Sequence, residues 1–97
     1  MRYEIIWLPK AEQRFDEIIS WLRQNWTDRE IDNFIDRVIE VLDLVRLNPR
    51  IYRYSGKGRI HQAVITRHTL LLFRIKKDKV ELLTFFDTRQ DPQKKFR

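Results

Sequence analysis

Four arginines and one histidine in the second half of the chain could act on a phosphate group. Arg59, Arg67, Arg74 and Arg89 lie on or beside predicted strands, and His68 follows Arg67 directly. The planar guanidinium group of arginine pairs with two phosphate or carboxylate oxygens, so this set can bind an anion. Cleavage of RNA by a 2′-hydroxyl needs an acid, a base and positive charge at the phosphate. We therefore name His68, Arg59, Arg74 and Arg89 as the catalytic residues of a nuclease, if the protein is one.

Each of these residues also has a structural interpretation. Alternation along the strand places Arg74 on the open face of a sheet, where it could form a salt bridge with Glu81 or Asp87. His68 falls at a predicted turn, where a histidine is often only solvated. His61 and His68 match no common metal-ligand spacing, and the chain has no cysteine, so we expect neither a metal nor a cofactor.

The positive charge of the chain is concentrated in one region. The net charge is +6, and residues 50–79 alone carry nine basic side chains and one acidic side chain. Such a region favours a polyanionic partner, either nucleic acid or an acidic protein segment, although a solvated basic surface would look the same. We assign target or nucleic-acid binding to one lysine and four arginines: Lys57, Arg59, Arg67, Arg74 and Arg89.

The loop predicted for residues 50–58 contains two short motifs. Lys57 lies between Gly56 and Gly58, the only glycines, but neither the spacing nor the context is that of a phosphate-binding loop. Tyr52 and Tyr54 alternate with arginines at positions 50 and 53. They could stack on nucleic-acid bases, or they could pack the loop against the helices.

Hydrophobic periodicity predicts an α+β fold of one domain over residues 1–97. A strand at residues 2–8 precedes two amphipathic helices, the second of which begins at a capping box of Thr27 and Glu30 and ends before Pro49. Strands follow at residues 59–66, 69–75 and 80–86, with turns at residues 67–68 and 76–79. The order is β–α–α–β–β–β, a helical hairpin packed on a small, mainly antiparallel sheet. We expect its core to contain Phe15, Ile19, Leu22, Phe34, Val38, Leu42, Leu71, Phe73 and Leu82.

Composition sets further limits on the class of protein. The N-terminus does not have the pattern of a signal peptide, and no apolar run reaches the length of about 20 residues that spans a membrane. With no cysteine, the chain suits a reducing compartment, and we expect a cytoplasmic protein that does not bind membranes. Trp26 fits the helical period of the core, whereas Trp21 does not.

Several of these segments together resemble the RelE/ParE superfamily, the toxins of bacterial type II toxin–antitoxin modules. The resemblance covers nearly the whole chain. It rests on WLPKA at residues 7–11, LNP at 47–49, the basic loop and Arg59, the hairpin of residues 71–86, and DTRQDP at 87–92. It implies a small cytoplasmic toxin that inhibits growth, with a role in plasmid stabilisation, and that is neutralised by a cognate antitoxin. It also allows a homodimer or a toxin–antitoxin hetero-oligomer.

The resemblance leaves two targets open. ParE-like members inhibit DNA gyrase, whereas RelE-like members are endoribonucleases that cleave messenger RNA on the ribosome, often with a histidine or tyrosine near the C-terminus. In this chain Asp87 occupies the position where a histidine is common, and no tyrosine follows Tyr54. This departure favours the ParE-like interpretation, and Arg89 matches the tail arginine of both branches. A member without toxicity is a third alternative.

Overall fold

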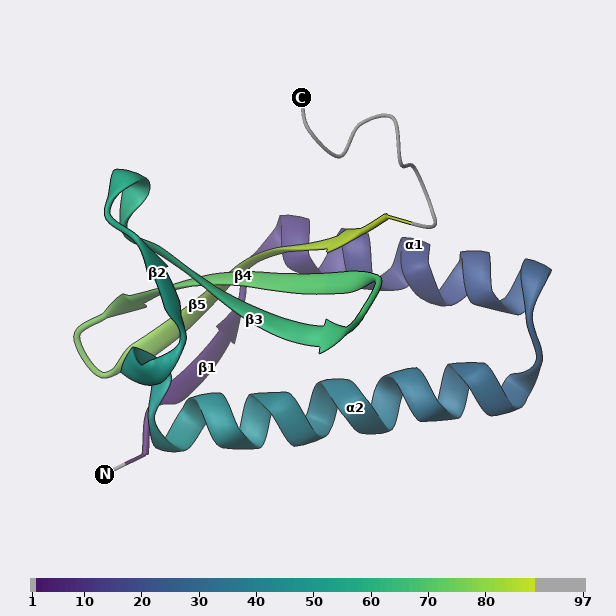
Figure 1. Cartoon of the computed structure of the whole chain (residues 1–97), viewed down its shortest axis with the longest axis horizontal. Coiled ribbons are helices and arrows are strands. Elements are labelled where there is room, and N and C mark those ends of the chain that lie inside the picture. The colour runs from purple at the N-terminus through teal and green to yellow at the C-terminus, as the bar shows by residue number, and fades with distance from the viewer. Residues whose placement is uncertain (1, 89–97) are drawn as a thin grey trace.

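Two helices and five strands make up the part of the chain that the structure, a computed structural model, describes, which is residues 2–88 (Figure 1). The helices follow the first strand, as the sequence predicts, and precede four further strands, one more than the three predicted. In chain order the elements are β1 (Glu4–Trp7), α1 (Pro9–Asn25), α2 (Asp28–Leu47), the 3₁₀ turn η1 (Pro49–Ile51), β2 (Arg53–Ser55), the 3₁₀ turn η2 (Lys57–Arg59), β3 (Ile60–Thr66), β4 (Thr69–Lys76) and β5 (Lys79–Asp87).

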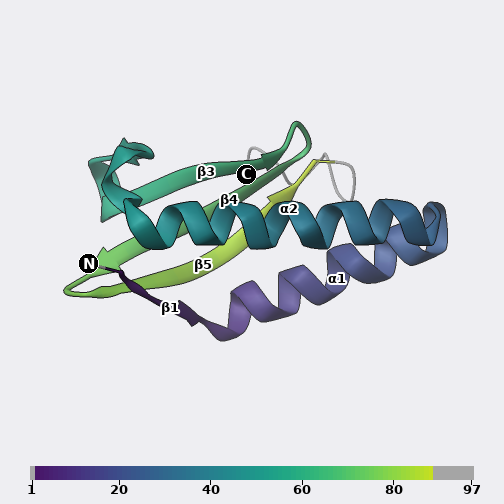
Figure 2. The same cartoon turned by 90° about the horizontal axis from the view of Figure 1, so that it is seen from below.

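The strands form a single sheet in the order β1-β5-β4-β3-β2. The first strand pairs parallel to the last, and all other neighbours are antiparallel. Both helices lie on the same face of the sheet, where α1 packs mainly against β5 and α2 against β3 (Figure 2). The α+β class and the helical hairpin on a mainly antiparallel sheet are therefore confirmed.

The loop predicted for residues 50–58 is wrong, because this segment contains β2 and parts of two 3₁₀ turns. β2 has only three residues, all exposed, and it adds a fifth strand to the edge of the sheet by pairing with β3. The strand that we predicted from residue 59 begins at Ile60, and Arg59 itself has a positive φ of 55°.

Both helices begin at residues that suit a helix N-terminus. Pro9 is the first residue of α1, where its fixed φ suits the helix and its missing N–H is not needed. At the start of α2, the Glu30 carboxylate accepts hydrogen bonds from the backbone N–H and the hydroxyl of Thr27. The hydrogen bond from the Thr27 hydroxyl is the main cause that lowers the pKa of Glu30. The predicted capping box is thus present.

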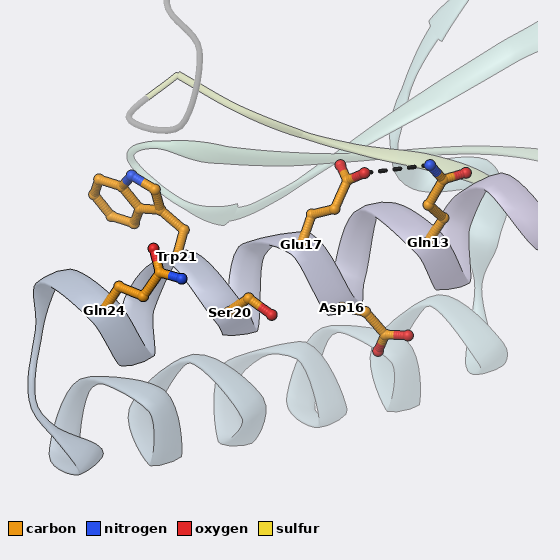
Figure 3. A pocket seen from close by; sticks show the side chains of 6 residues that line it. All are labelled: Gln13, Asp16, Glu17, Ser20, Trp21 and Gln24. Carbon is orange, nitrogen blue, oxygen red and sulfur yellow. Dashed lines mark hydrogen bonds between the residues drawn. The ribbon is translucent and has the colours of Figure 1, made fainter.

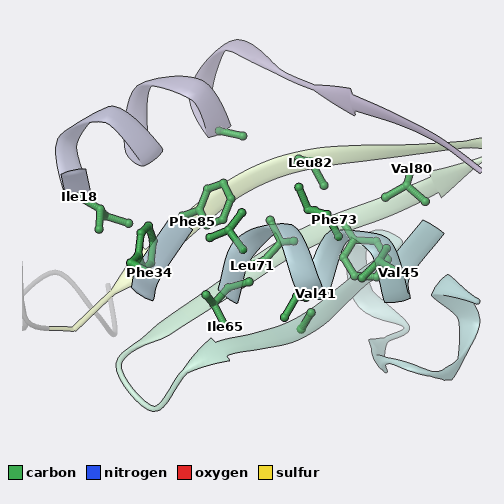
Figure 4. Packing of buried hydrophobic residues seen from close by; sticks show 14 of the residues in the cluster. Ile18, Phe34, Val41, Val45, Ile65, Leu71, Phe73, Val80, Leu82 and Phe85 are labelled. Carbon is green, nitrogen blue, oxygen red and sulfur yellow. The ribbon is translucent and has the colours of Figure 1, made fainter. Parts of the chain in front are cut away.

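The core lies between the sheet and the helices (Figure 4). Of the nine predicted core residues, seven are buried, while Phe15 and Ile19 are partly buried and pack against the others. The ring of Phe15 lies within 6 Å of three aromatic rings, at centroid distances of 5.4 Å to Trp7, 5.8 Å to Phe34 and 5.7 Å to Phe85.

The two tryptophan predictions are wrong. Trp26 is 51% exposed because it is the C-cap of α1, where the extended backbone turns its side chain off the helical period. Trp21 is partly buried and packs against the core instead of pointing away from it.

The face of the sheet opposite the helices is largely uncharged. Across β3, β4 and β5 the register aligns Val64 with Leu70 and Phe86. The next row contains Gln62, Leu72 and Thr84, which are also uncharged. Arg74 is the one arginine within these three strands, so the arginine-rich sheet that the sequence suggested is not observed.

The turn between β4 and β5 is strained at one position. Lys76 pairs with Lys79, which leaves Lys77 and Asp78 as a two-residue turn, and Lys77 has a φ of 59°. A positive φ at the first central residue is a feature of type II′ turns, where glycine is preferred.

Replacing Lys77 with glycine should therefore stabilise the protein by about 1 kcal/mol, because glycine adopts this φ without a steric cost. Thermal unfolding should show a Tm higher by about 4–8 °C. Asp78→Gly is the matched control, since Asp78 is not at a positive φ and gains nothing from glycine. A Tm that rises no more for Lys77→Gly than for Asp78→Gly would contradict this account of the turn.

Candidate functional site: two basic ends of one sheet

The predicted functional residues lie at opposite ends of the sheet. Arg67 and His68 form the turn between β3 and β4, whereas Lys57 and Arg59 lie in η2 before β3. Arg74 is six residues beyond His68 along β4, a distance of about 20 Å at 3.3 Å per residue. His68 and Arg74 therefore cannot contact the same phosphate group in one chain. Arg89 lies outside the described residues.

The turn end of the sheet contains a small polar cluster. The guanidinium Nε of Arg67 donates to Nε2 of His68 at 3.4 Å. The backbone N–H of Thr88 donates to the carbonyl of His68 at 2.9 Å, so the chain leaves β5 directly beside this turn. His68 is partly buried, and its own backbone N–H donates to the Thr66 hydroxyl at 3.1 Å. Its position is thus set by hydrogen bonds on two sides.

The opposite end contains a polar pocket of about 640 Å³, lined by Arg50, Tyr54, Arg59, His61 and Ile75. Arg50 comes from η1, and Arg59 ends η2. Tyr54 of β2 pairs with His61 of β3, so both side chains lie on the same face of the sheet. Of the five residues, Arg59 is among the target-binding residues predicted from sequence, and Tyr54 and Arg50 belong to the segment that we considered for stacking on bases. The pairing of β2 with β3 brings Tyr54 next to His61, and the sequence of β2 has no hydrophobic period that would predict this pairing.

The two tyrosines of this segment have different environments. Tyr52 is partly buried against the core, and its ring meets that of Phe73 in an edge-on arrangement at a centroid distance of 5.9 Å. Burial raises the pKa of its phenol. Tyr54 is 52% exposed. Of the two interpretations, packing therefore describes Tyr52, and only Tyr54 presents its ring to solvent.

Arg74 lies on the open face, as strand alternation predicts, and is exposed. Its Nε donates to the Glu81 carboxylate at 2.6 Å, across the β4–β5 pair. The salt bridge that we considered as the structural interpretation is therefore present. Any anionic ligand at Arg74 would compete with Glu81.

Asp87, at the position where nuclease members commonly have a histidine, is a buried residue. It is 1% exposed and accepts a hydrogen bond of 2.6 Å from the hydroxyl of Thr69, which is also buried. A side chain at this position points into the protein and holds the ends of β4 and β5 together.

Replacing Asp87 with alanine should lower the free energy of unfolding by about 1.5–3 kcal/mol, because it removes a charge-assisted hydrogen bond and leaves the Thr69 hydroxyl without this acceptor. Asp87→Asn keeps an acceptor oxygen, so it should lower the free energy of unfolding by less. Urea unfolding of both variants measures the difference. Equal stability of Asp87→Ala and the parent protein would show that the buried pair is dispensable.

A second depression, of about 590 Å³, lies on the outer surface of α1 (Figure 3). One helix supplies its whole lining, which includes the carboxylates of Asp16 and Glu17. Glu17 is already held by Gln13 at 3.2 Å and by Arg14 at 3.1 Å. None of the predicted site residues is present, and the negative charge makes it unsuitable for a phosphate.

Residues 2–88 contain neither a cluster of metal ligands nor a membrane-spanning helix. No three histidine, aspartate or glutamate side chains in this part gather into a metal-binding cluster. Neither described helix is long and apolar enough to cross a membrane.

The helical hairpin and the sheet in which the first strand pairs with the last agree with the fold that the resemblance to the RelE/ParE superfamily implies. The family model for the ParE toxin of the type II toxin–antitoxin system parDE matches residues 5–92. The chain therefore belongs to the ParE toxin family, and it is a toxin of a type II toxin–antitoxin module. A search of curated proteins gave no match.

Solved structures share the fold at low sequence identity. A chain of the chromosomal ParDE system from P. aeruginosa superposes with a TM-score of 0.75 at 15% identity, covering 89% of this chain and 96% of that one. The YoeB dimer from Staphylococcus aureus gives a TM-score of 0.63 at 13% sequence identity, and the match covers 89% of this chain and 97% of that one. The YoeB–YefM complex from the same species gives a TM-score of 0.58 at 13% sequence identity, and the match covers the same shares of the two chains. At such identities these matches establish the fold.

Proposed function

We propose that this toxin inhibits bacterial growth by acting on DNA gyrase, and that a cognate antitoxin neutralises it. The membership of this chain in the ParE family supports the proposed action on DNA gyrase. The observation that carries the choice of target is the separation of His68 from Arg59 and Arg74 by most of the length of the sheet. A nuclease site needs its acid or base and its phosphate-binding charge at one phosphate. In residues 2–88 the proposed nuclease residues are not assembled in that way.

The antitoxin follows from the same family and from the charge of the chain. Residues 50–79 have nine basic side chains and one acidic side chain, and of the nine, only Arg74, Arg67 and Lys79 make a polar side-chain contact within residues 2–88. A partner with negative charge would neutralise this region and associate faster with it. The ParDE and YoeB–YefM structures are systems of a toxin with its antitoxin, which supports the same kind of partner here.

Induced expression in bacteria tests the target. The full chain should arrest growth and produce gyrase-trapped DNA breaks or a loss of supercoiling, while messenger RNA on ribosomes remains intact. Cleaved transcripts with normal supercoiling would instead assign the chain to the RelE-like ribonucleases. Co-expression with the antitoxin should restore growth. Ready expression of the lone chain without growth arrest would count against both targets.

A further inference from the structure

Three aromatic rings lie one after another at the pocket between η1, β2 and η2. The Phe73 ring belongs to the core, and the His61 ring stacks parallel to it, at a centroid distance of 5.2 Å and an interplanar angle of 9°. The Tyr54 ring lies next to His61 at a centroid distance of 4.7 Å, tilted by 42°. Nδ1 of His61 lies 3.2 Å from the carbonyl of Tyr52, which can only accept, so this nitrogen carries a proton and fixes the ring. The row of rings thus ends in an exposed tyrosine ring on a rigid, buried base.

Two arginines of this pocket have no polar partner among the described residues. Arg50 and Arg59 both line the pocket, and within residues 2–88 neither makes a hydrogen bond or an ion pair. Arg59 is held at a φ of 55°, directly after Gly58 at 76°. A left-handed conformation is unfavourable for arginine, and such positions are common where a side chain must be directed at a ligand.

We propose that this pocket, defined by Arg50, Tyr54, Arg59, His61 and Ile75, binds one nucleotide of a single-stranded nucleic acid. A base stacks on Tyr54, and Arg50 and Arg59 bind the adjacent phosphate. Exposed aromatic rings beside positive charge are the common means of binding single strands, and an aromatic platform accepts any base. The volume of about 640 Å³ falls within the usual range for small-ligand sites, about 300–1,000 Å³.

An acidic peptide fits these features less well. Its carboxylates would satisfy the two arginines but would leave the tyrosine ring and its supporting stack without a role. A duplex also fits poorly, because its bases are already stacked on one another. The proposal goes beyond gyrase inhibition and does not depend on it. It concerns the end of the sheet that holds Arg59, whereas His68 lies in the turn at the opposite end.

Fluorescence anisotropy of the full chain with a labelled twelve-nucleotide oligothymidylate tests the site. Tyr54→Ala should weaken binding about tenfold or more, as expected for the loss of one stacked base, while Tyr54→Phe retains it. Arg59→Gly removes the guanidinium and suits the positive φ, so the fold is preserved. It should make the slope of log K against log salt shallower by about 0.7, the effect of one lost phosphate contact on a single strand.

Arg23→Ala is the matched control for charge, because Arg23 is exposed on α1, outside the pocket. It should leave the salt slope and the affinity nearly unchanged. Unchanged binding by Tyr54→Ala, or equal salt slopes for Arg59→Gly and Arg23→Ala, would overturn the proposal. So would a duplex of the same length that binds as tightly as the single strand. A twelve-residue glutamate peptide that binds more tightly, and is lost with Arg59→Gly, would assign the pocket to a protein partner instead.

Discussion

Replacing Phe73 with alanine should lower the free energy of unfolding by about 3–5 kcal/mol. Phe73 is fully buried in the middle of the sheet. The centroid of its ring lies 5.2 Å from that of His61 and 5.9 Å from that of Tyr52. Truncation would leave a cavity at the junction of the core and the aromatic stack. Because small domains are stable by only about 5–15 kcal/mol, this change removes a large part of the total. Urea unfolding, with the slope m compared between variants, measures it.

Leu72→Ala is the control for this prediction. Leu72 is the neighbour of Phe73 on β4 but lies on the open face, partly exposed, so its truncation should cost much less. If the two variants lose similar stability, the assignment of the helix-facing and open faces of β4 is wrong. A loss below about 1 kcal/mol for Phe73→Ala would contradict the large cavity term on which the prediction rests.

Replacing Arg89 with alanine should abolish toxicity while leaving folding and antitoxin binding nearly intact. Arg89 directly follows Thr88, the last described residue, whose backbone N–H donates to the carbonyl of His68. An arginine with an anionic target contributes to recognition, whereas a surface arginine contributes little to stability, typically under about 1 kcal/mol. Growth after induction measures toxicity, and circular dichroism with thermal unfolding measures the fold.

Arg89→Lys separates two roles for this residue. Lysine keeps the charge but lacks the planar fork that binds two oxygens at once. Reduced toxicity of the lysine variant would indicate oriented binding of a phosphate or carboxylate, whereas full toxicity would indicate general electrostatic attraction. Unfolding of Arg89→Ala would show that the residue is structural, and our assignment of it to the target site would then be wrong.

The elements with a clear hydrophobic period could be predicted from the sequence, and the others could not. The two helices and the strands from β3 to β5 follow periods of about 3.6 and 2 residues. β2 has no such signal, because Arg53, Tyr54 and Ser55 are all exposed and the strand exists only through its pairing with β3. Trp26 was assigned to the core because it continued the period of α1 past the point where the helix ends.

For the predicted site residues, strand alternation predicts the orientation of Arg74, whereas the distances between these residues require the structure. Alternation along β4 correctly placed Arg74 on the open face, because side chains of a strand point to alternate sides. Grouping Arg74 with His68 ignored their separation along one strand, which the sequence already contained. The pocket around Tyr54 was less accessible to sequence reasoning, since it requires the register of β2 against β3 and the positive φ of Arg59.

The parallel pairing of β1 with β5 determines when the fold can form during synthesis. Trp7 lies opposite Leu82, which is translated much later in the chain. A nascent chain that has not reached Lys79 has no partner for its first strand, and the apolar face of its helical hairpin is only partly covered. Contacts between distant parts of a chain also slow folding. The complete sheet can therefore form only after β5 has been translated, and a message cut short before that point would yield a chain whose first strand has no partner.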